Sequence, residues 1–183
     1  MKNIIVTFFI TVVYIQAGVI GIAGKGNYPT IQEGLNAALE GETIAISAGT
    51  YTENITWPAT NGIKLFCSGE ADCIIDGNDA ESVIIFNVDG IDATTSISGF
   101  TIQNGSGSNA GGGIRCLSSS PTFENLTIIG NSAPSGGGIF LGEGSNPTLT
   151  DVTISGNIAI GSADLYGDGG GIKCKDSSNP ILI

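Results

Sequence analysis

Gly-Gly-Gly-Ile-Arg-Cys, at residues 111–116, is the first of three related stretches in this chain. The other two are Gly-Gly-Gly-Ile-Phe-Leu at 136–141 and Gly-Gly-Gly-Ile-Lys-Cys at 169–174. A second motif repeats in step with them, at 121–128 and again at 147–154. Motifs that recur in one order at similar spacings indicate an internal repeat, whose units bury their apolar faces only against one another. The repeat is therefore the feature that decides the fold.

The apolar positions of the repeat predict how its copies stack. Aligning residues 95–102, 121–128 and 147–154 gives three positions that are apolar in every copy. These are Ile97, Phe123 and Leu149; Phe100, Leu126 and Val152; and Ile102, Ile128 and Ile154. We expect these positions to face inward, and variable ones such as Gly99, Asn125 and Asp151 to face solvent. Short strands with a fixed repeat predict an all-β, single-stranded, right-handed parallel β-helix rather than a sandwich.

One helix is predicted ahead of the repeats, over residues 30–40. Thr30, followed three residues later by a glutamate, forms a capping box. The apolar residues Ile31, Leu35 and Leu39 recur every four residues and form one stripe. Because a stack of coils exposes its apolar core at the ends, we expect this short helix to cover the N-terminal end.

The N-terminus predicts export. Residues 1–17 place Lys2 before an apolar run and end on a small residue, as a cleavable signal peptide does. The alternative is an uncleaved anchor, against which Gln16 and nearby glycines argue. We therefore expect a secreted or outer cell-surface protein with no stable membrane span in the mature chain. Residues 18–183 are expected to form the β-helix domain, incomplete at its C-terminus because the chain stops where another repeat strand is due.

Composition narrows the classes of partner and chemistry. The 183 residues include 6 basic and 17 acidic side chains and no histidine, for a net charge of −11. An acidic surface repels phosphate backbones, so no nucleic-acid partner is expected. The lack of histidine excludes Ser-His-Asp and Cys-His nucleophiles and removes the commonest zinc ligand. We predict no metal site and no cofactor from these residues.

The four cysteines are predicted to differ in role. Cys67 and Cys73 flank a turn, and both a disulfide and two free thiols are compatible with that spacing. Cys116 and Cys174 occupy equivalent positions two copies apart, which is too far for a disulfide. We predict that both are small buried apolar residues.

The glycine-rich segments 105–113 and 130–138 are interpreted as turns. They lack the Lys-Ser/Thr ending and the following helix of a phosphate-binding loop. Glycine instead permits close approach of the backbone at each turn. Asn131 and Asn157 fall at the same turn of successive copies and are expected to form a hydrogen-bonded ladder.

These motifs resemble those of the right-handed parallel β-helix proteins of the pectin lyase-like superfamily. The entry segment at residues 27–38 is similar to the first coil of pectinesterases. The Ile-x-x-Asn-x-Ala repeats at 128–133 and 154–159, each followed by Gly-Gly-Gly-Ile, resemble repeats of polymorphic outer-membrane adhesins. The resemblance implies the fold across essentially the whole mature chain, but it implies no single activity because this scaffold carries lyases, esterases, hydrolases and adhesins alike.

The candidate ligand-binding residues follow each Gly-Gly-Gly-Ile. Arg115, Phe140 and Lys173 occupy this outward position, and Asp168 lies next to the third copy. In a lyase of the kind the resemblance implies, Arg115 or Lys173 would act as the base, and Asp168 with Asp176 would hold calcium. The plainer interpretation is a solvated face with scattered charges. No residue is assigned a catalytic role.

We therefore predict an adhesin or glycan-binding module whose partner is a polysaccharide or a cell-surface glycan. The alternative is a polysaccharide lyase or a pectinesterase-like esterase, truncated before its active coils, with calcium as a cofactor if it is a lyase. A third possibility is a purely structural stalk.

Overall fold

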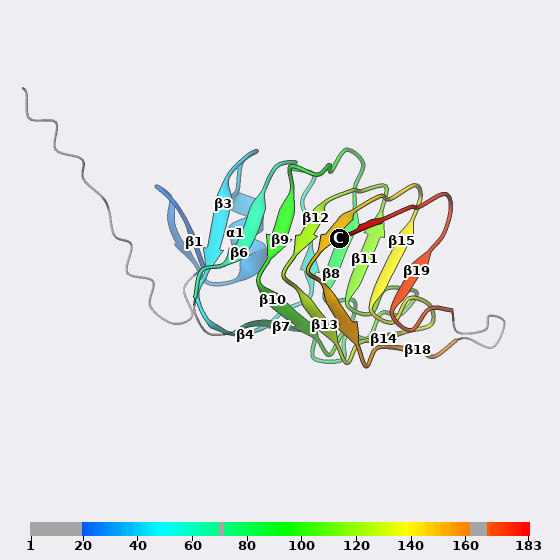
Figure 1. The fold of residues 1–183 in the computed structure, drawn as a ribbon. Coiled ribbons are helices and arrows are strands. Elements are labelled where there is room, and N and C mark those ends of the chain that lie inside the picture. Colours follow the sequence, from blue (N-terminus) through cyan, green and yellow to red (C-terminus); the bar gives the residue numbers. More distant parts are fainter. Residues whose placement is uncertain (1–19, 70–71, 162–167) are drawn as a thin grey trace, which may run out of the picture.

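Short strands stack along the molecule into three large, mainly parallel sheets, which together form a β-helix (Figure 1). The computed structural model describes residues 20–69, 72–161 and 168–183. The predicted signal peptide at residues 1–17 lies outside this described part. The predicted all-β parallel β-helix is confirmed. No helix among the described residues is long and apolar enough to cross a bilayer.

Sheet A contains the first strands of the chain. Its members, in sequence order, are β1 (Ile20–Ile22), β2 (Gly26–Tyr28), β3 (Thr43–Ile46), β6 (Lys64–Cys67), β9 (Ser96–Ser98), β12 (Thr122–Glu124), β16 (Thr148–Thr150) and β20 (Ile181–Leu182). β1 pairs antiparallel with both β2 and β3. From β3 onward every pairing in the sheet is parallel.

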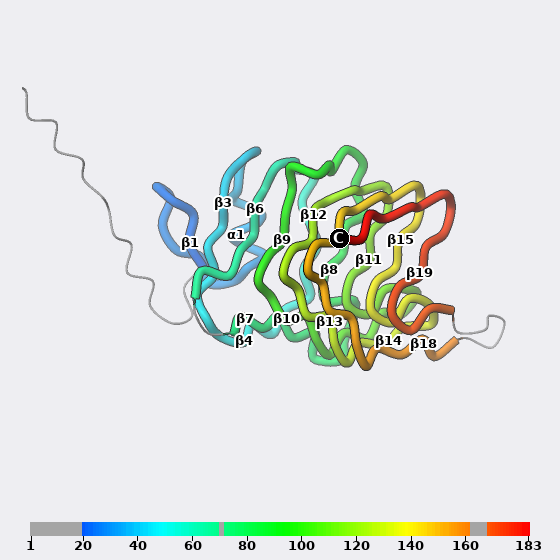
Figure 2. The backbone as a smooth tube through the Cα atoms, viewed as in Figure 1, coloured from blue at the N-terminus to red at the C-terminus, as the bar shows by residue number. Residues whose placement is uncertain are grey.

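Sheets B and C each stack five parallel strands. Sheet B contains β4 (Gly49–Thr52), β7 (Cys73–Asp76), β10 (Phe100–Gln103), β13 (Thr127–Ile129) and β17 (Thr153–Ser155). Sheet C contains β5 (Ile55–Thr56), β8 (Ile84–Asn87), β11 (Ile114–Leu117), β15 (Ile139–Gly142) and β19 (Ile172–Cys174). The short strands β14 (Ser132–Ala133) and β18 (Ile158–Ala159) pair with each other between the strands of B and C. Each coil thus passes from A to B to C before the next begins (Figure 2).

The core confirms the predicted register. Phe123 lies between Ile97 and Leu149 in sheet A, and all three are buried. The other two predicted columns also face inward, although their last members, Val152 and Ile154, are only partly buried. Elsewhere in the core, the rings of Trp57 and Phe86 stack with centroids 4.8 Å apart, and Phe86 also meets Phe123 at 6.0 Å. Successive coils therefore share one continuous apolar interior.

The variable positions predicted to face solvent form the corner between sheets A and B. Gly99, Asn125 and Asp151 are exposed, and their φ angles are 81°, 50° and 53°. This left-handed conformation costs little for glycine and is tolerated by asparagine and aspartate. The corner thus restricts which residues the variable position accepts.

The predicted N-terminal helix is present as α1 (Ile31–Ala37), at the end of the stack next to β1 (Figure 1). The Thr30 hydroxyl accepts the Glu33 N–H at 3.1 Å, and Ile31 and Leu35 are fully buried. The predicted extension to residue 40 is wrong, because Ala38 is already extended and Leu39 is 63% exposed.

The helix ends early because its last groups find other partners. The Ala38 N–H donates to the Leu35 carbonyl, and the Leu39 N–H donates to the Glu42 carboxylate at 2.7 Å. These bonds turn the chain toward β3, so Leu39 no longer continues the apolar stripe of α1.

The structure shows which cysteines form a disulfide and which are free thiols. Cys67 and Cys73 form a disulfide with their Cα atoms 5.9 Å apart, joining the end of β6 to the start of β7. Cys116 is a buried thiol, as predicted. The prediction for Cys174 is wrong, because this residue is exposed. It lies in β19, which is the end strand of sheet C among the strands that the structure describes, so one side of β19 is uncovered in this structure.

Candidate functional site

The candidate residues lie in one column on the outer face of sheet C. Arg115 pairs in register with Phe140, and Phe140 pairs with Lys173. Along β11 and β15 these residues alternate with fully buried neighbours, so their side chains point away from the core. The predicted column is therefore present, while its role in binding stays a prediction.

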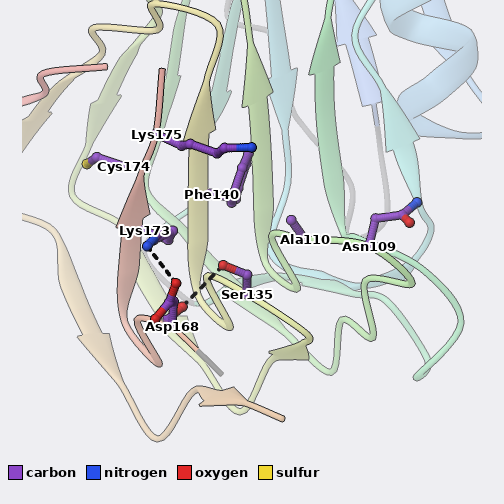
Figure 3. Close-up of a pocket in the computed structure, with 8 residues that line it drawn as sticks. All are labelled: Asn109, Ala110, Ser135, Phe140, Asp168, Lys173, Cys174 and Lys175. Carbon is purple, nitrogen blue, oxygen red and sulfur yellow. Dashed lines mark hydrogen bonds and ion pairs between the residues drawn. The ribbon is translucent and has the colours of Figure 1, made fainter. Parts of the chain in front are cut away.

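A hollow of about 440 Å³ lies beside the two later members of this column (Figure 3). Its lining residues come from β15 and β19, from the turns before β11, β15 and β19, and from the turn after β19. They are Asn109, Ala110, Ser135, Phe140, Asp168, Lys173, Cys174 and Lys175. Arg115 is not part of the lining, although it is the neighbour of Phe140 in the sheet. The hollow thus unites three of the four predicted ligand-binding residues.

An ion pair closes one side of the hollow. The Lys173 ammonium lies 2.8 Å from the Asp168 carboxylate, and Figure 3 shows the two side chains directed toward each other. Both side chains remain accessible, with 31% and 58% of their surface exposed. Exposed ion pairs contribute only about 0–1 kcal/mol to stability. The pair is therefore available to exchange partners with a polar ligand at little cost to the fold.

The backbone around Asp168 is fixed by the preceding coil. Its carbonyl accepts hydrogen bonds from the Gly136 N–H at 2.9 Å and from the Ser135 hydroxyl at 3.3 Å. In the same way, the Ser135 carbonyl accepts the Gly111 N–H of the coil before. Asp168 and Ser135 are thus consecutive rungs of one ladder at the mouth of the hollow.

A glycine makes room for the aromatic ring. Gly142 lies two residues after Phe140 on the same outward side of β15. A Cβ at Gly142 would lie 3.0 Å from Phe140 Cε1 and 2.9 Å from Leu117 Cδ2. Real side chains do not pack so closely. The Phe140 ring can therefore lie over Gly142 only because glycine has no side chain. Gly142 is therefore a residue that positions Phe140.

The aspartates predicted as calcium ligands lie beside lysines. Asp168 is paired with Lys173, and Asp176 Oδ2 lies 4.0 Å from Lys175 Nζ. Within the described ranges, no group of three or more Cys, Asp or Glu side chains could hold a metal ion.

The sequence analysis predicted Asp168 but missed Ala110 and Ser135, which stand at the same position before the other two glycine triplets and also line the hollow. Ala110, Ser135 and Asp168 each stand directly before three glycines, so the repeat itself contained this signal. Asn109 and Lys175 carried no comparable signal, because they occupy turns whose path depends on the neighbouring coils. Figure 3 shows Lys175 reaching from the turn after β19 toward Phe140.

Comparison with known proteins identifies the fold family. No curated protein and no solved structure matches the chain. The family described as "Right handed beta helix region" matches residues 47–183, which is well over half of the chain. In general, the β-helix scaffold is associated with surface proteins and with carbohydrate-related proteins. With the observed stacking of sheets A, B and C, this match shows that the chain belongs to the right-handed β-helix family.

Proposed function

We propose that this chain is a glycan-binding module of an exported or surface-displayed β-helix protein, and that the hollow beside Phe140 holds a sugar ring. The observation that carries the proposal is an aromatic side chain in a shallow hollow bordered by a carboxylate, an ammonium, a hydroxyl and an amide. Small-molecule sites combine an apolar surface with a few placed polar groups. The C–H face of a sugar can pack on Phe140, while Asp168 and Lys173 bond to its hydroxyl groups.

The distribution of charge supports a ligand that carries carboxylate groups. The chain has 6 basic residues, and three of them, Arg115, Lys173 and Lys175, lie on or beside the outer face of sheet C. Elsewhere the excess of acidic side chains would repel an anionic polymer. A glycan containing uronic acids would therefore approach this face in preference to the others.

The test is binding of the full chain to a glycan array with neutral and uronate-containing members. Affinities for the best ligands are then measured by calorimetry for Phe140→Ala and for Phe66→Ala. Phe66 is a matched control, because it is a half-buried aromatic on the outer face of sheet A. We expect Phe140→Ala to weaken binding at least tenfold and Phe66→Ala to leave it unchanged. Equal affinities for the two variants would overturn the site, and silence on the array together with no cell binding would overturn the function.

The alternative, a polysaccharide lyase or pectinesterase-like enzyme, is supported by the basic side chains in the sheet C column. A lyase needs a base beside the carbon that loses its proton. Here Lys173 Nζ donates to Asp168 instead of facing an open position. Incubation with polygalacturonate and calcium distinguishes the two functions. Release of unsaturated uronate by the chain, abolished in Lys173→Ala, would replace the binding proposal with the lyase.

A further inference from the structure

We infer that Asn125 is a site of N-linked glycosylation. Asn-x-Ser/Thr, where x is not proline, is the acceptor sequence for this modification in exported proteins. The chain contains three such sequences: Asn54-Ile55-Thr56, Asn104-Gly105-Ser106 and Asn125-Leu126-Thr127. All three lie in the described part of the chain, so the surroundings of the three amide nitrogens can be compared. The glycan is joined through Nδ2, which makes the environment of that atom decisive.

The amide of Asn54 is used to join two coils. Its Nδ2 lies 3.3 Å from each of three backbone carbonyls of the following coil, those of Gly77, Glu81 and Ser82. Attachment of a sugar replaces one of the two N–H donors and places a bulky group where these carbonyls converge. A glycan at Asn54 would therefore cost hydrogen bonds that hold the coils together.

Asn104 is more enclosed by the surrounding chain than Asn54. Its Nδ2 donates to the Asp76 carboxylate at 2.8 Å. A Cβ at the next residue, Gly105, would lie only 2.0 Å from the Gly112 carbonyl oxygen, and Ser106 forms a bridge with Ser132. The second acceptor sequence thus lies in a tightly packed turn, where a glycan has no room.

Asn125 differs from both asparagines in its hydrogen bonds. Like Asn54 it is exposed, at the corner between β12 and β13, but its side chain makes no hydrogen bond with any residue that the structure describes. Its backbone N–H donates to the Thr150 carbonyl at 3.0 Å, which fixes the main chain while the side chain projects outward. The equivalent corner of the preceding coil is Gly99, which adds no side chain beside the amide. Thr127, the third residue of the acceptor sequence, follows at the start of β13.

The chemistry needs a donor from the export pathway, and the inference therefore rests on the predicted export of the chain. A C–N bond forms between Asn125 Nδ2 and C1 of the first sugar of a lipid-pyrophosphate-linked oligosaccharide. The C1–O bond to the pyrophosphate breaks, the lipid pyrophosphate leaves, and the amide loses one proton. Because the fold makes no use of this side chain, a glycan on Asn125 leaves the hydrogen bonds between the coils intact.

The experiment expresses the full chain behind a cleavable secretion leader in a eukaryotic host that attaches N-glycans. The leader supplies export whatever residues 1–17 do. The secreted protein is weighed by mass spectrometry before and after treatment with an amidase that removes N-glycans, and its glycopeptides are mapped. The wild-type chain is compared with Asn125→Gln and with the matched variants Asn54→Gln and Asn104→Gln.

We expect the glycan mass to be lost in Asn125→Gln and retained in the other two variants. A secreted wild-type chain without amidase-sensitive mass would overturn the inference. It would also fail if the peptides of Asn54 or Asn104 were occupied as fully as that of Asn125. Peptide mapping of the wild-type chain gives the answer even if a variant fails to be secreted. Because no glycan ligand is added, the outcome is independent of the binding function proposed above.

Discussion

At the scale of single residues, the side chains of the buried Asn131 and the partly buried Asn157 hydrogen-bond to the backbone of the neighbouring coils. Asn131 Oδ1 accepts the Gly105 N–H at 2.8 Å, and its Nδ2 donates to the Ile102 carbonyl at 3.0 Å. Asn157 Oδ1 in turn accepts the backbone N–H of Asn131 at 2.9 Å. Each asparagine therefore supplies hydrogen-bond partners for N–H and carbonyl groups at the turn of the preceding coil, where these groups do not bond to each other. This is the ladder that the repeat predicted.

Asn131→Ala is expected to destabilise the protein by about 2 kcal/mol, because it leaves the buried Gly105 N–H without an acceptor. The measurement is urea unfolding followed by circular dichroism. Asn87→Ala is the matched control, since Asn87 is exposed on the outer face of sheet C. The ladder would have no energetic role if both variants unfolded at the same urea concentration.

The Asp76 side chain makes the stability of the folded protein depend on pH. The pKa of its carboxyl is lowered from the usual 3.8, mainly because the Gln103 side-chain amide donates to it, and further by the Asn78 N–H and the Asn104 amide. A lowered pKa in the folded state gives stability that is present above the unfolded pKa and is lost as pH falls through the folded one.

The wild-type chain should therefore exceed Asp76→Asn in stability at pH 7, and the difference should shrink as the pH falls below about 4. Unfolding curves of both proteins at a series of pH values check this. A difference that stays constant from pH 7 to pH 3 would contradict the assigned cause.

At the scale of elements, the capping helix is held by a residue from the first coil. The Glu53 carboxylate accepts the N–H groups of Ile31 at 2.9 Å and Gln32 at 3.1 Å, so it satisfies the free donors at the start of α1. The negative charge also lies at the positive end of the helix. Together with Thr30, this side chain fastens α1 over the end of the stack.

Replacing Glu53 with alanine should cost about 1–2 kcal/mol of local stability, because two charge-assisted hydrogen bonds are lost. Native-state hydrogen exchange is the suitable measurement, since it reports opening of α1 separately from global unfolding. The amides of α1 should exchange faster in Glu53→Ala and remain unchanged in Glu40→Ala, whose side chain is exposed. Uniform acceleration throughout the sheets would show instead that Glu53 supports the whole fold.

At the scale of the whole molecule, the four cysteines occupy three different environments: a disulfide, a buried thiol and an exposed thiol. The disulfide between Cys67 and Cys73 closes a short loop, for which the chain-entropy estimate gives about 2 kcal/mol of stabilisation. Burial raises the pKa of the Cys116 thiol to about 12, whereas Cys174 remains exposed. The three environments should be separable by reactivity, because only an accessible thiolate is alkylated readily.

Alkylation of the native protein at pH 8 should therefore label Cys174 alone. Cys116 should react only after unfolding, and Cys67 and Cys73 only after reduction. Peptide mass spectrometry after each step identifies the labelled residues. Labelling of Cys67 or Cys73 without a reductant would contradict the disulfide.

Individual residues show how far the sequence could predict the site. The column of Arg115, Phe140 and Lys173 was predictable, because each residue follows the same motif in its copy. The pairing of Asp168 with Lys173 was not, because both side chains lie on the surface and choose partners by local geometry. Glu53 was likewise unpredictable as a helix cap, since it lies more than twenty residues from the N–H groups that it binds.

The repeat alone was enough to predict the β-helix, the inward columns and the asparagine ladder. Every coil must fill the same apolar interior and turn at the same points, so these positions repeat along the chain and can be recognised. Three features became visible only in the folded chain: the residues that share the hollow beside Phe140, the disulfide between Cys67 and Cys73, and the acceptor asparagine whose amide makes no hydrogen bond. Outward side chains face water and are constrained by the path of neighbouring turns rather than by a repeated core. Their arrangement depends on contacts between coils, which leave no periodic signal in the sequence.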